Sequence, residues 1–319
     1  MPKMTILSPG PLSTIQDAGR FGYMDTGFSP NGAMDLYSMK IANILVGNAM
    51  CDGVIEMTMM GVSVKFDAVS TIAITGADMQ PELNGEPAKM YCAIEVKPGD
   101  VLSLKMAKSG MRSYLAVAGG FDIPLAMGSM STNLKCALGG FEGRKLKKGD
   151  EIPLRQSVPK EHVGSREIKP ENNFENTIFV RVVLGPQDDY FTEEGINTFL
   201  SCEYTVSDKS DRMGVRLDGE QIENKNGVDI ISDGISTGAV QIPASGTPII
   251  MMADRQTTGG YAKIANVISA DLKNIAQAKP GTKVKFKAVS EKEAVSLKKE
   301  EDKKLKKLQY ELTYSVWKD

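Results

Sequence analysis

The chain has 319 residues and a formal net charge of −2, and at about 150 residues per domain its length predicts two domains or one large one. Hydrophobic residues make up 41% and charged residues 24%, a globular balance that excludes a disordered chain, while near-neutrality argues against nucleic acid or an anionic membrane as partner. No apolar run approaches the ~20 residues of a membrane span, and residues 1–10 lack the apolar region of a signal peptide.

Short runs of β-branched residues, separated by clusters of Gly, Pro, Asn and Asp, run through most of the chain and predict β-strands. The clearest of these segments are 62–66, 71–75, 101–104, 178–184 and 284–286. Many short strands joined by tight turns are typical of barrels and sandwiches. We therefore expect a mainly β fold.

Helical spacing of apolar residues is restricted to a few segments, and it predicts helices over 34–45, 189–200 and 265–277. The last segment, 290–312, mixes Glu and Lys with a partial apolar stripe and predicts a charged C-terminal helix. Its simplest interpretation is a solvated surface helix with ion pairs one turn apart. The alternative is a helix that docks on a partner.

Two short matches indicate an internal duplication: Ile6-Leu7-Ser8-Pro9-Gly10-Pro11 resembles Val183-Leu184-Gly185-Pro186, and Lys97-Pro98-Gly99 recurs as Lys279-Pro280-Gly281. The polar stretch 156–173 is the best candidate for a linker. We expect a first β unit over residues 1–155 and a second over residues 174–319 that includes the C-terminal helix.

The cysteine and histidine counts restrict the possible chemistry. The four cysteines form no Cys-X-X-Cys pair, which argues against a zinc or thioredoxin-type site, and free thiols without a signal peptide indicate the cytoplasm. The single histidine, His162, lies in the expected linker, a poor setting for a Ser-His-Asp or Cys-His mechanism. We expect no metal site, and catalysis would use carboxylates, Lys, Arg, Tyr, hydroxyls or backbone amides.

The densest group of reactive side chains lies in segment 254–263, Asp-Arg-Gln-Thr-Thr-Gly-Gly-Tyr-Ala-Lys. Adjacent glycines allow a tight turn that points several amide N–H groups at one place, so the segment predicts a nest for an oxyanion, carboxylate or phosphate. Lys263 would add a positive charge, and Asp254 would orient a donor or take a proton. The alternative is a glycine turn whose polar groups cap one another. The motif GxxxxGK[ST] is absent, so nothing in this chain alone supports ATP binding.

Two further groups pair Arg with Asp. Asp211, Arg212 and Arg216 predict either a clamp for a substrate carboxylate or a structural pair that closes a hairpin. Asp17 and Arg20 allow the same two interpretations.

Short motifs over about residues 4–290 carry a family resemblance, and they occur in a fixed order. They are Pro9-Gly10-Pro11, Gln16-Asp17, Gly19-Arg20, Gly32-Ala33-Met34-Asp35, Ala116-Val117-Ala118-Gly119-Gly120, Gly128-Ser129, Gly139-Gly140-Phe141-Glu142-Gly143-Arg144, Gly185-Pro186-Gln187-Asp188-Asp189, Ser210-Asp211-Arg212-Met213-Gly214, Gly238-Ala239-Val240-Gln241-Ile242-Pro243 and Asp254-Arg255-Gln256-Thr257-Thr258-Gly259-Gly260-Tyr261. Together they resemble the biotin-dependent carboxyltransferase-like family. That family includes the C subunit of prokaryotic 5-oxoprolinase, the Kip antagonist protein and the carboxyltransferase region of urea carboxylase (allophanate hydrolase subunit 2). Where the family usually has Pro after Gly-Gly-Tyr, this chain has Ala262.

The resemblance implies two cyclophilin-like β-barrel units. For stand-alone bacterial members it implies ATP-dependent opening of 5-oxoproline to L-glutamate together with the A and B subunits of the enzyme. ATP would be used by the complex, and the implied partners are the A subunit and a Kip inhibitor-like homologue of the B subunit. Phosphorylation of the amide oxygen would turn the unstrained lactam into a better electrophile.

Combined with the residue chemistry, the resemblance implies two sets of site residues. The expected catalytic residues are Asp254, Thr258 and Lys263. The expected substrate-binding residues are Asp17, Arg20, Arg212, Arg216, Arg255, Gln256, Thr257, Gly259, Gly260 and Tyr261.

Two alternative functions remain open at this point. One is a regulatory binding protein that relieves inhibition of a sporulation kinase by sequestering the homologue of the B subunit, which needs an interface but no chemistry. The other is carboxyl transfer to urea or a related amide. That reaction needs carboxybiotin from a separate carrier, because the chain has no Met-Lys-Met biotinylation site.

Overall fold

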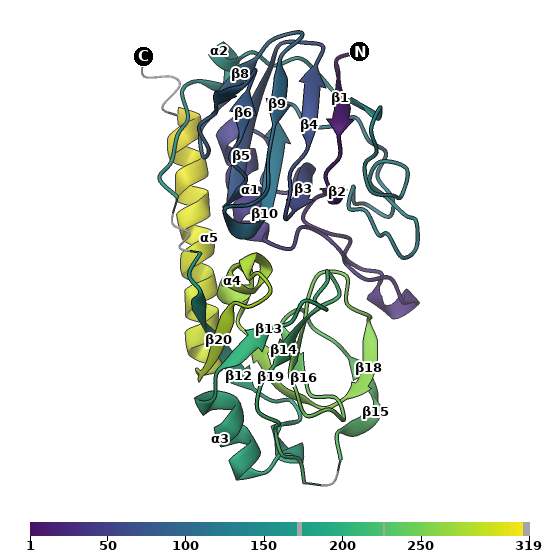
Figure 1. Ribbon diagram of the computed structural model, residues 1–319, viewed down its shortest axis with the longest axis vertical. Helices are drawn as coiled ribbons and strands as arrows, with labels where there is room; N and C mark the ends of the chain where they lie inside the picture. The colour runs from purple at the N-terminus through teal and green to yellow at the C-terminus, as the bar shows by residue number, and fades with distance from the viewer. Residues whose placement is uncertain (171–173, 226, 315–319) are drawn as a thin grey trace. The chain divides into compact units, whose positions relative to one another are not determined.

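The computed structural model describes residues 1–170, 174–225 and 227–314, and the chain divides into two compact units (Figure 1). Unit 1 comprises Met1–Arg20, Asn31–Asn173 and Lys303–Asp319, and unit 2 comprises Phe21–Pro30 and Phe174–Asp302. The division differs from the expected one in two places. The segment Phe21–Pro30 belongs to unit 2, where Ser29 Oγ donates a hydrogen bond to the Arg255 carbonyl, and the end of the C-terminal helix belongs to unit 1.

The strands of unit 1 form two antiparallel sheets. A six-stranded sheet has the order β11-β1-β4-β9-β6-β7, and a five-stranded sheet has the order β2-β3-β10-β5-β8. The bounds are β1 Lys3–Ser8, β2 Leu12–Gln16, β3 Val54–Thr58, β4 Ser63–Phe66, β5 Ser70–Asp78, β6 Glu82–Leu83, β7 Glu86–Pro87, β8 Ile94–Val96, β9 Val101–Ser103, β10 Ser109–Val117 and β11 Glu151–Pro153.

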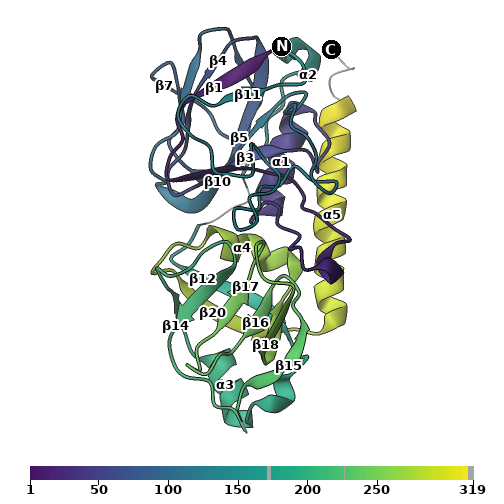
Figure 2. The ribbon, with the colours of Figure 1, turned by 90° about the vertical axis from the view of Figure 1, so that its right-hand side faces the viewer.

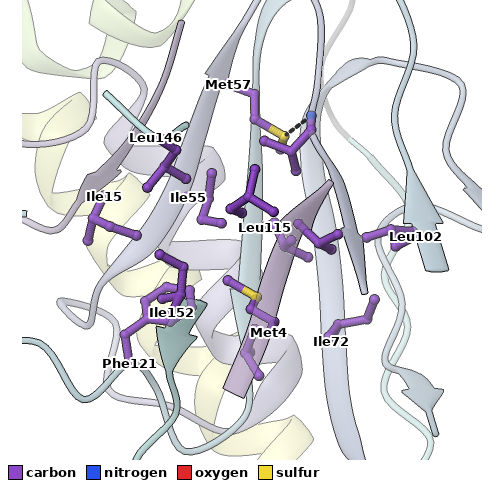
Figure 3. Packing of buried hydrophobic residues seen from close by; sticks show 14 of the residues in the cluster. Met4, Ile15, Ile55, Met57, Ile72, Leu102, Leu115, Phe121, Leu146 and Ile152 are labelled. Carbon is purple, nitrogen blue, oxygen red and sulfur yellow. Dashed lines mark hydrogen bonds between the residues drawn. The ribbon is translucent and has the colours of Figure 1, made fainter. Parts of the chain in front are cut away.

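The two sheets share one hydrophobic core. Alternate residues of the strands point into it, among them Met4 of β1, Ile55 of β3 and Leu115 of β10, all fully buried (Figure 3). The barrel expected for this unit is thus built as two sheets around a common apolar centre.

A second core in unit 1 lies between the five-stranded sheet and helix α1 (Leu36–Val46). Helix α1 begins after Asp35, whose side chain accepts a hydrogen bond from the Ser38 backbone N–H at 2.9 Å. Small residues on the sheet, such as Ala73 and Ala116, leave room for the apolar face of the helix. Leu305, near the end of the chain, is 2% exposed and belongs to this same core, which explains why the end of the last helix groups with unit 1.

Unit 2 is a closed barrel of seven strands in the order β12-β19-β16-β17-β14-β13-β20, with a separate two-stranded ribbon, β15-β18 (Figure 2). Strands β12 and β20 pair in parallel, and the other neighbours pair antiparallel. The bounds are β12 Thr177–Leu184, β13 Tyr204–Val206, β14 Gly214–Asp218, β15 Asp229–Gly234, β16 Ala239–Gln241, β17 Ile249–Met251, β18 Thr258–Tyr261, β19 Lys263–Val267 and β20 Lys283–Ala288.

The remaining helices are short, apart from the last one. They are α2 Lys160–Val163, α3 Glu193–Ser201, α4 Leu272–Gln277 and α5 Glu291–Tyr314, with 3-10 turns η1 Met24–Thr26, η2 Asp188–Tyr190 and η3 Ser269–Asp271. The charged C-terminal helix is confirmed as α5, in which Lys298 pairs with Asp302 at 2.7 Å. Across the described ranges, no helix combines the length and apolarity needed to cross a bilayer.

The mainly β expectation is confirmed, and two helix predictions need correction. The segment 265–277 is not one helix, because its first residues continue strand β19 between β12 and β16. The helix expected over 189–200 begins only at Glu193, since Thr192 caps it by accepting a hydrogen bond from the Gly195 N–H at 2.9 Å. The expected linker contains helix α2, and its described residues belong to unit 1.

Candidate functional site

The glycine pair predicted to form an anion nest lies in a strand instead. Strand β18 pairs antiparallel with β15, placing Gly259 opposite Asp233 and Thr258 opposite Gly234. Neither Gly259 nor Gly260 has a positive φ. Their amides therefore follow one another along an extended strand and do not converge on one point, so the predicted nest is wrong.

Two residues expected to contact substrate pair with each other. The Arg212 guanidinium donates to both carboxylate oxygens of Asp254, at 2.8 Å and 3.0 Å, and Arg212 is only 6% exposed. Nearby, Asp211 Oδ1 accepts hydrogen bonds from the backbone N–H groups of Met213 and Gly214. Arg212 therefore makes a structural contact with Asp254, which lies outside the group expected to close a hairpin, and this contact ties the turn before β14 to the loop before β18.

Lys263 lies in a second polar network. Its ammonium group is almost fully buried and contacts the Asp233 carboxylate at 2.7 Å and the Gly234 carbonyl at 3.3 Å. The hydrogen bond from Lys263 holds the pKa of Asp233 below its ordinary value. The Gln187 side chain accepts a hydrogen bond from the Lys263 backbone N–H at 3.1 Å. The motif 185–189 is therefore in contact with the segment 254–263. Lys263 was expected to supply a positive charge to a ligand, and in the structure its charge is paired with Asp233.

Arg255 is buried in the same unit, at 4% exposure. Its Nε donates to the Ile235 carbonyl at 2.8 Å, and burial lowers its pKa to about 10. It therefore anchors the loop before β18 from the inside, and the hydroxyl of Ser29 holds its backbone carbonyl. Thr257 takes part in the same local structure, since its carbonyl accepts from the Ile235 N–H.

Asp17 and Arg20 lie in unit 1 and are held by structural hydrogen bonds. The Asp17 carboxylate accepts from the Ser129 hydroxyl at 2.7 Å and from the Met130 N–H at 2.6 Å. Arg20 is 1% exposed and donates to the carbonyls of Ala126 and Ser131. Both side chains fasten the loop after β10 and offer no free group of their own to a ligand.

Three of the expected substrate-binding residues do meet, at a cavity of about 440 Å³ in unit 2. Arg216 of β14, Gln256 and Tyr261 of β18 line it. The remaining lining residues are Asp211, Met213, Gly214, Gln241, Pro243, Ala244, Ser245, Ile249 and Met251. Figure 2 labels the strands β14, β16, β17 and β18 from which most of these side chains come.

The cavity combines polar side chains that have hydrogen-bonding capacity left with an apolar lining. Among the described residues, the Arg216 guanidinium forms no ion pair and the Gln256 carboxamide no hydrogen bond. Met213, Ile249 and Met251 form part of the small apolar cluster of unit 2 and supply the walls. A guanidinium and free amides over apolar walls suit a small polar ligand with one negative charge.

Gln241 is the functional candidate that the sequence prediction missed. It lies at the end of β16, is 2% exposed and lines the cavity. Its Nε2 makes one long hydrogen bond, 3.4 Å to the Tyr261 carbonyl. Gln241 belongs to the motif 238–243 that contributes to the family resemblance, but no chemical pattern marked it as a site residue, and the pairing of β16 with β17 and β19 places it at the cavity.

Within the described ranges, no three His, Cys, Asp or Glu side chains are grouped to hold a metal ion. The single unpaired guanidinium at the cavity suits one carboxylate better than a triphosphate, whose charges need several cations or a nest.

Comparison with known proteins places the chain in a family. A family profile described as carboxyltransferase domain, subdomain A and B, matches residues 26–288. The chain belongs to this carboxyltransferase family. It is 36% identical to the C subunit of 5-oxoprolinase from Escherichia coli, over 97% of this chain and 98% of that protein. It is 38% identical to the C subunit of 5-oxoprolinase from Haemophilus influenzae, over 93% and 94% of the two chains.

Among solved structures, the urea amidolyase of K. lactis superposes on this family member with a TM-score of 0.89 at 31% identity. The match covers 96% of this chain but only 20% of the amidolyase chain. The urea amidolyase of Saccharomyces cerevisiae, 34% identical, is likewise matched over only 17% of its length. The fold is thus shared by proteins of very different size.

Proposed function

We propose that this chain is the C subunit of an ATP-dependent 5-oxoprolinase that opens 5-oxoproline to L-glutamate together with the A and B subunits. The observation that carries the proposal is the end-to-end match, over 97% and 98% of the two chains, to the C subunit of the Escherichia coli 5-oxoprolinase. In the urea amidolyases the corresponding region is a small part of a larger enzyme.

The proposed reaction is an amide hydrolysis driven by ATP. Phosphoryl transfer from ATP to the lactam oxygen forms ADP and an activated ring. Water attacks the ring carbon and the C–N bond breaks, which leaves an acyl phosphate, and a second water hydrolyses this acyl phosphate to the carboxylate of glutamate and inorganic phosphate. The ring nitrogen takes up a proton to become the amino group of glutamate. Arg216 would hold the substrate carboxylate throughout, and the ion pair between buried Lys263 and exposed Asp233 lies close to the strand that lines the cavity. ATP is assigned to the complex.

The partners proposed are the A subunit and a Kip inhibitor-like B subunit, and the proposed compartment is the cytoplasm. The second point is supported by the four cysteines, all of which are free thiols.

Reconstitution tests the proposal. Purified A and B subunits, mixed with this chain, should release glutamate from 5-oxoproline only when ATP is present, and omission of this chain should abolish the release. Equal glutamate release without this chain would refute its assignment as a required component. Hydrolysis of ATP by the chain alone with 5-oxoproline would refute the need for partners.

Carboxyl transfer to urea or a related amide is a second candidate, favoured by the TM-score of 0.89 to urea amidolyase. It requires a biotinylated carrier as a separate protein. A complex isolated with this chain should then give a streptavidin-positive band. A biotin-free complex that opens 5-oxoproline would exclude this candidate.

A further inference from the structure

We propose that the cavity of unit 2 binds a small ring that contains an amide and carries a carboxylate, through the carboxamides of Gln241 and Gln256 and the guanidinium of Arg216. The inference rests on the proposed function for one point only, the choice of 5-oxoproline as the natural ligand of this class. Its geometric basis is independent of that choice.

The first observation is that the side-chain carboxamides of Gln241 and Gln256 both lie close to the Gly259 backbone. A Cβ atom added to Gly259 would lie 2.7 Å from the Ile235 Cδ1, 3.2 Å from the Gln241 Nε2 and 3.4 Å from the Gln256 Nε2. Both amides therefore meet beside Gly259, at a place that any side chain there would occupy. The crowding by Ile235 and by the two amides together explains why the strand has a glycine at a position with ordinary φ.

The second step is that these carboxamides have capacity left for a ligand. Gln256 forms no side-chain hydrogen bond with the described residues, and Gln241 forms a single long one although it is 2% exposed. Gln241 is buried and Gln256 is half-buried, and unused donors and acceptors in such positions gain free energy when a ligand satisfies them. Such a pair is therefore a prepared site for a complementary polar group.

The third step identifies that group. A five-membered ring holds its amide cis, so N–H and C=O point to the same side, whereas an open-chain amide is almost always trans. A side-chain carboxamide also presents N–H and C=O side by side and can form two parallel hydrogen bonds with a cis amide. Open-chain amides and simple amino acids lack this arrangement.

The fourth step accounts for charge. Arg216 lines the same cavity with a guanidinium that no carboxylate of the described residues neutralises, and guanidinium groups bind carboxylates through two parallel hydrogen bonds. Asp211 also lines the cavity, but its Oδ1 already accepts two backbone N–H groups. Met213 and Met251 would pack against the methylene groups of the ring.

Calorimetry on the full chain with four small probes tests the inference. The probes are 5-oxo-L-proline, L-proline without the amide carbonyl, 2-pyrrolidinone without the carboxylate, and 2-imidazolidinone, a cyclic urea. We expect 5-oxo-L-proline to bind tightest, and each of the others to bind at least about tenfold more weakly, because each lacks one of the two recognised groups. Equal affinity for L-proline, or tighter binding of the cyclic urea, would overturn the inference.

Variants then locate the site. Arg216→Ala should weaken 5-oxo-L-proline about tenfold or more and leave 2-pyrrolidinone unchanged, whereas Gly259→Ala and Gln256→Ala should weaken both. Gly234→Ala is the matched control, since a Cβ there would meet no atom within 4 Å. Unchanged affinities in Arg216→Ala and Gly259→Ala would overturn the assignment.

The same variants in the reconstituted complex separate the two proposals. A raised KM for 5-oxoproline in Gly259→Ala supports the site. An active complex whose KM is unchanged in Arg216→Ala, Gly259→Ala and Gln256→Ala overturns the site, while the proposed function stands. A chain that binds 5-oxo-L-proline with the expected variant pattern, in a complex that releases no glutamate, would refute the function and leave the site intact. Lack of binding to the chain, together with unchanged KM in the variants, overturns the inference.

Discussion

Arg212 and Asp254, 42 residues apart in the sequence, form a bidentate ion pair with N–O distances of 2.8 Å and 3.0 Å. The pair joins the turn before β14 to the loop before β18, and Asp254 N–H also donates to the Arg212 carbonyl at 2.9 Å. The ion pair and this backbone hydrogen bond together join the two segments that flank the cavity. A structural role accounts for both residues without substrate contact.

Arg212→Met should therefore destabilise the protein. The substitution removes the bidentate ion pair from the Asp254 carboxylate, and removal of one member of a buried ion pair costs about 2–4 kcal/mol when the other stays partly solvated. Thermal unfolding of the variant should show a clearly lower midpoint. Unchanged stability with complete loss of activity would instead indicate direct contact with substrate.

The Lys263–Asp233 pair predicts a pH dependence of stability. Lys263 lowers the pKa of Asp233 below the ordinary value of 3.8, so the pair stabilises the fold fully above that pH, and its contribution is lost as the pH falls through the lowered pKa. Asp233→Asn should lower the unfolding midpoint at pH 7, and the difference from the parent protein should shrink below pH ~3.8.

Asp229→Asn, in the same strand, is the control for that experiment, since the Asp229 side chain forms no hydrogen bond or ion pair with the described residues. It should shift the midpoint little at any pH. A difference between Asp233→Asn and the parent protein that persists unchanged at pH 3 would contradict the pairing.

Asp17 should prove structural. Asp17→Ala leaves the buried Ser129 hydroxyl and the Met130 N–H without their acceptor, and losses of this kind cost about 2–4 kcal/mol together. Chemical denaturation should show the loss, while the affinity for 5-oxo-L-proline stays unchanged at a temperature where the variant is folded. Full stability with weakened ligand binding would restore the substrate-binding role that the sequence suggested.

Leu305 connects helix α5 to the core of unit 1. Leu305→Ala should destabilise that unit by about 2–4 kcal/mol, because a fully buried leucine leaves a cavity. Hydrogen exchange should accelerate in α1, which packs in the same core. Val295→Ala, on the exposed face of the same helix at 52% exposure, should change stability by no more than about 0.5 kcal/mol. Equal effects of both substitutions would contradict this packing.

Local sequence patterns predicted much of the fold because they reflect local causes. Runs of β-branched residues between turn residues, as in segments 62–66 and 178–184, predicted the strands, and the Glu and Lys pattern predicted α5. The helix expected over 265–277 failed because β19 is defined by partners far away, at residues 182–184 and 239–241. Apolar spacing alone does not distinguish a short buried strand from one helical turn.

The site was predicted only in part for the same reason. Arg216, Gln256 and Tyr261 do line one cavity, but the conformation of Gly259 and Gly260 was wrong, since a glycine pair allows an extended strand as readily as a turn. The ion pair of Arg212 could not be predicted, because its partner Asp254 is distant in the sequence and no local pattern links the two residues. Gln241 was invisible until β16 and β18 were placed around the same cavity.

The segment make-up of the two units has a consequence for biosynthesis. Unit 1 takes its core from the first residues of the chain and from Leu305, and unit 2 includes Phe21–Pro30 from near the beginning. A ribosome therefore releases the closing piece of unit 1 only after all of unit 2 has been made. During translation the apolar core of unit 1 stays partly exposed until Leu305 has been synthesised, and exposed apolar surface of this kind is what chaperones bind. Truncation before Leu305 would leave the same surface exposed in the finished chain.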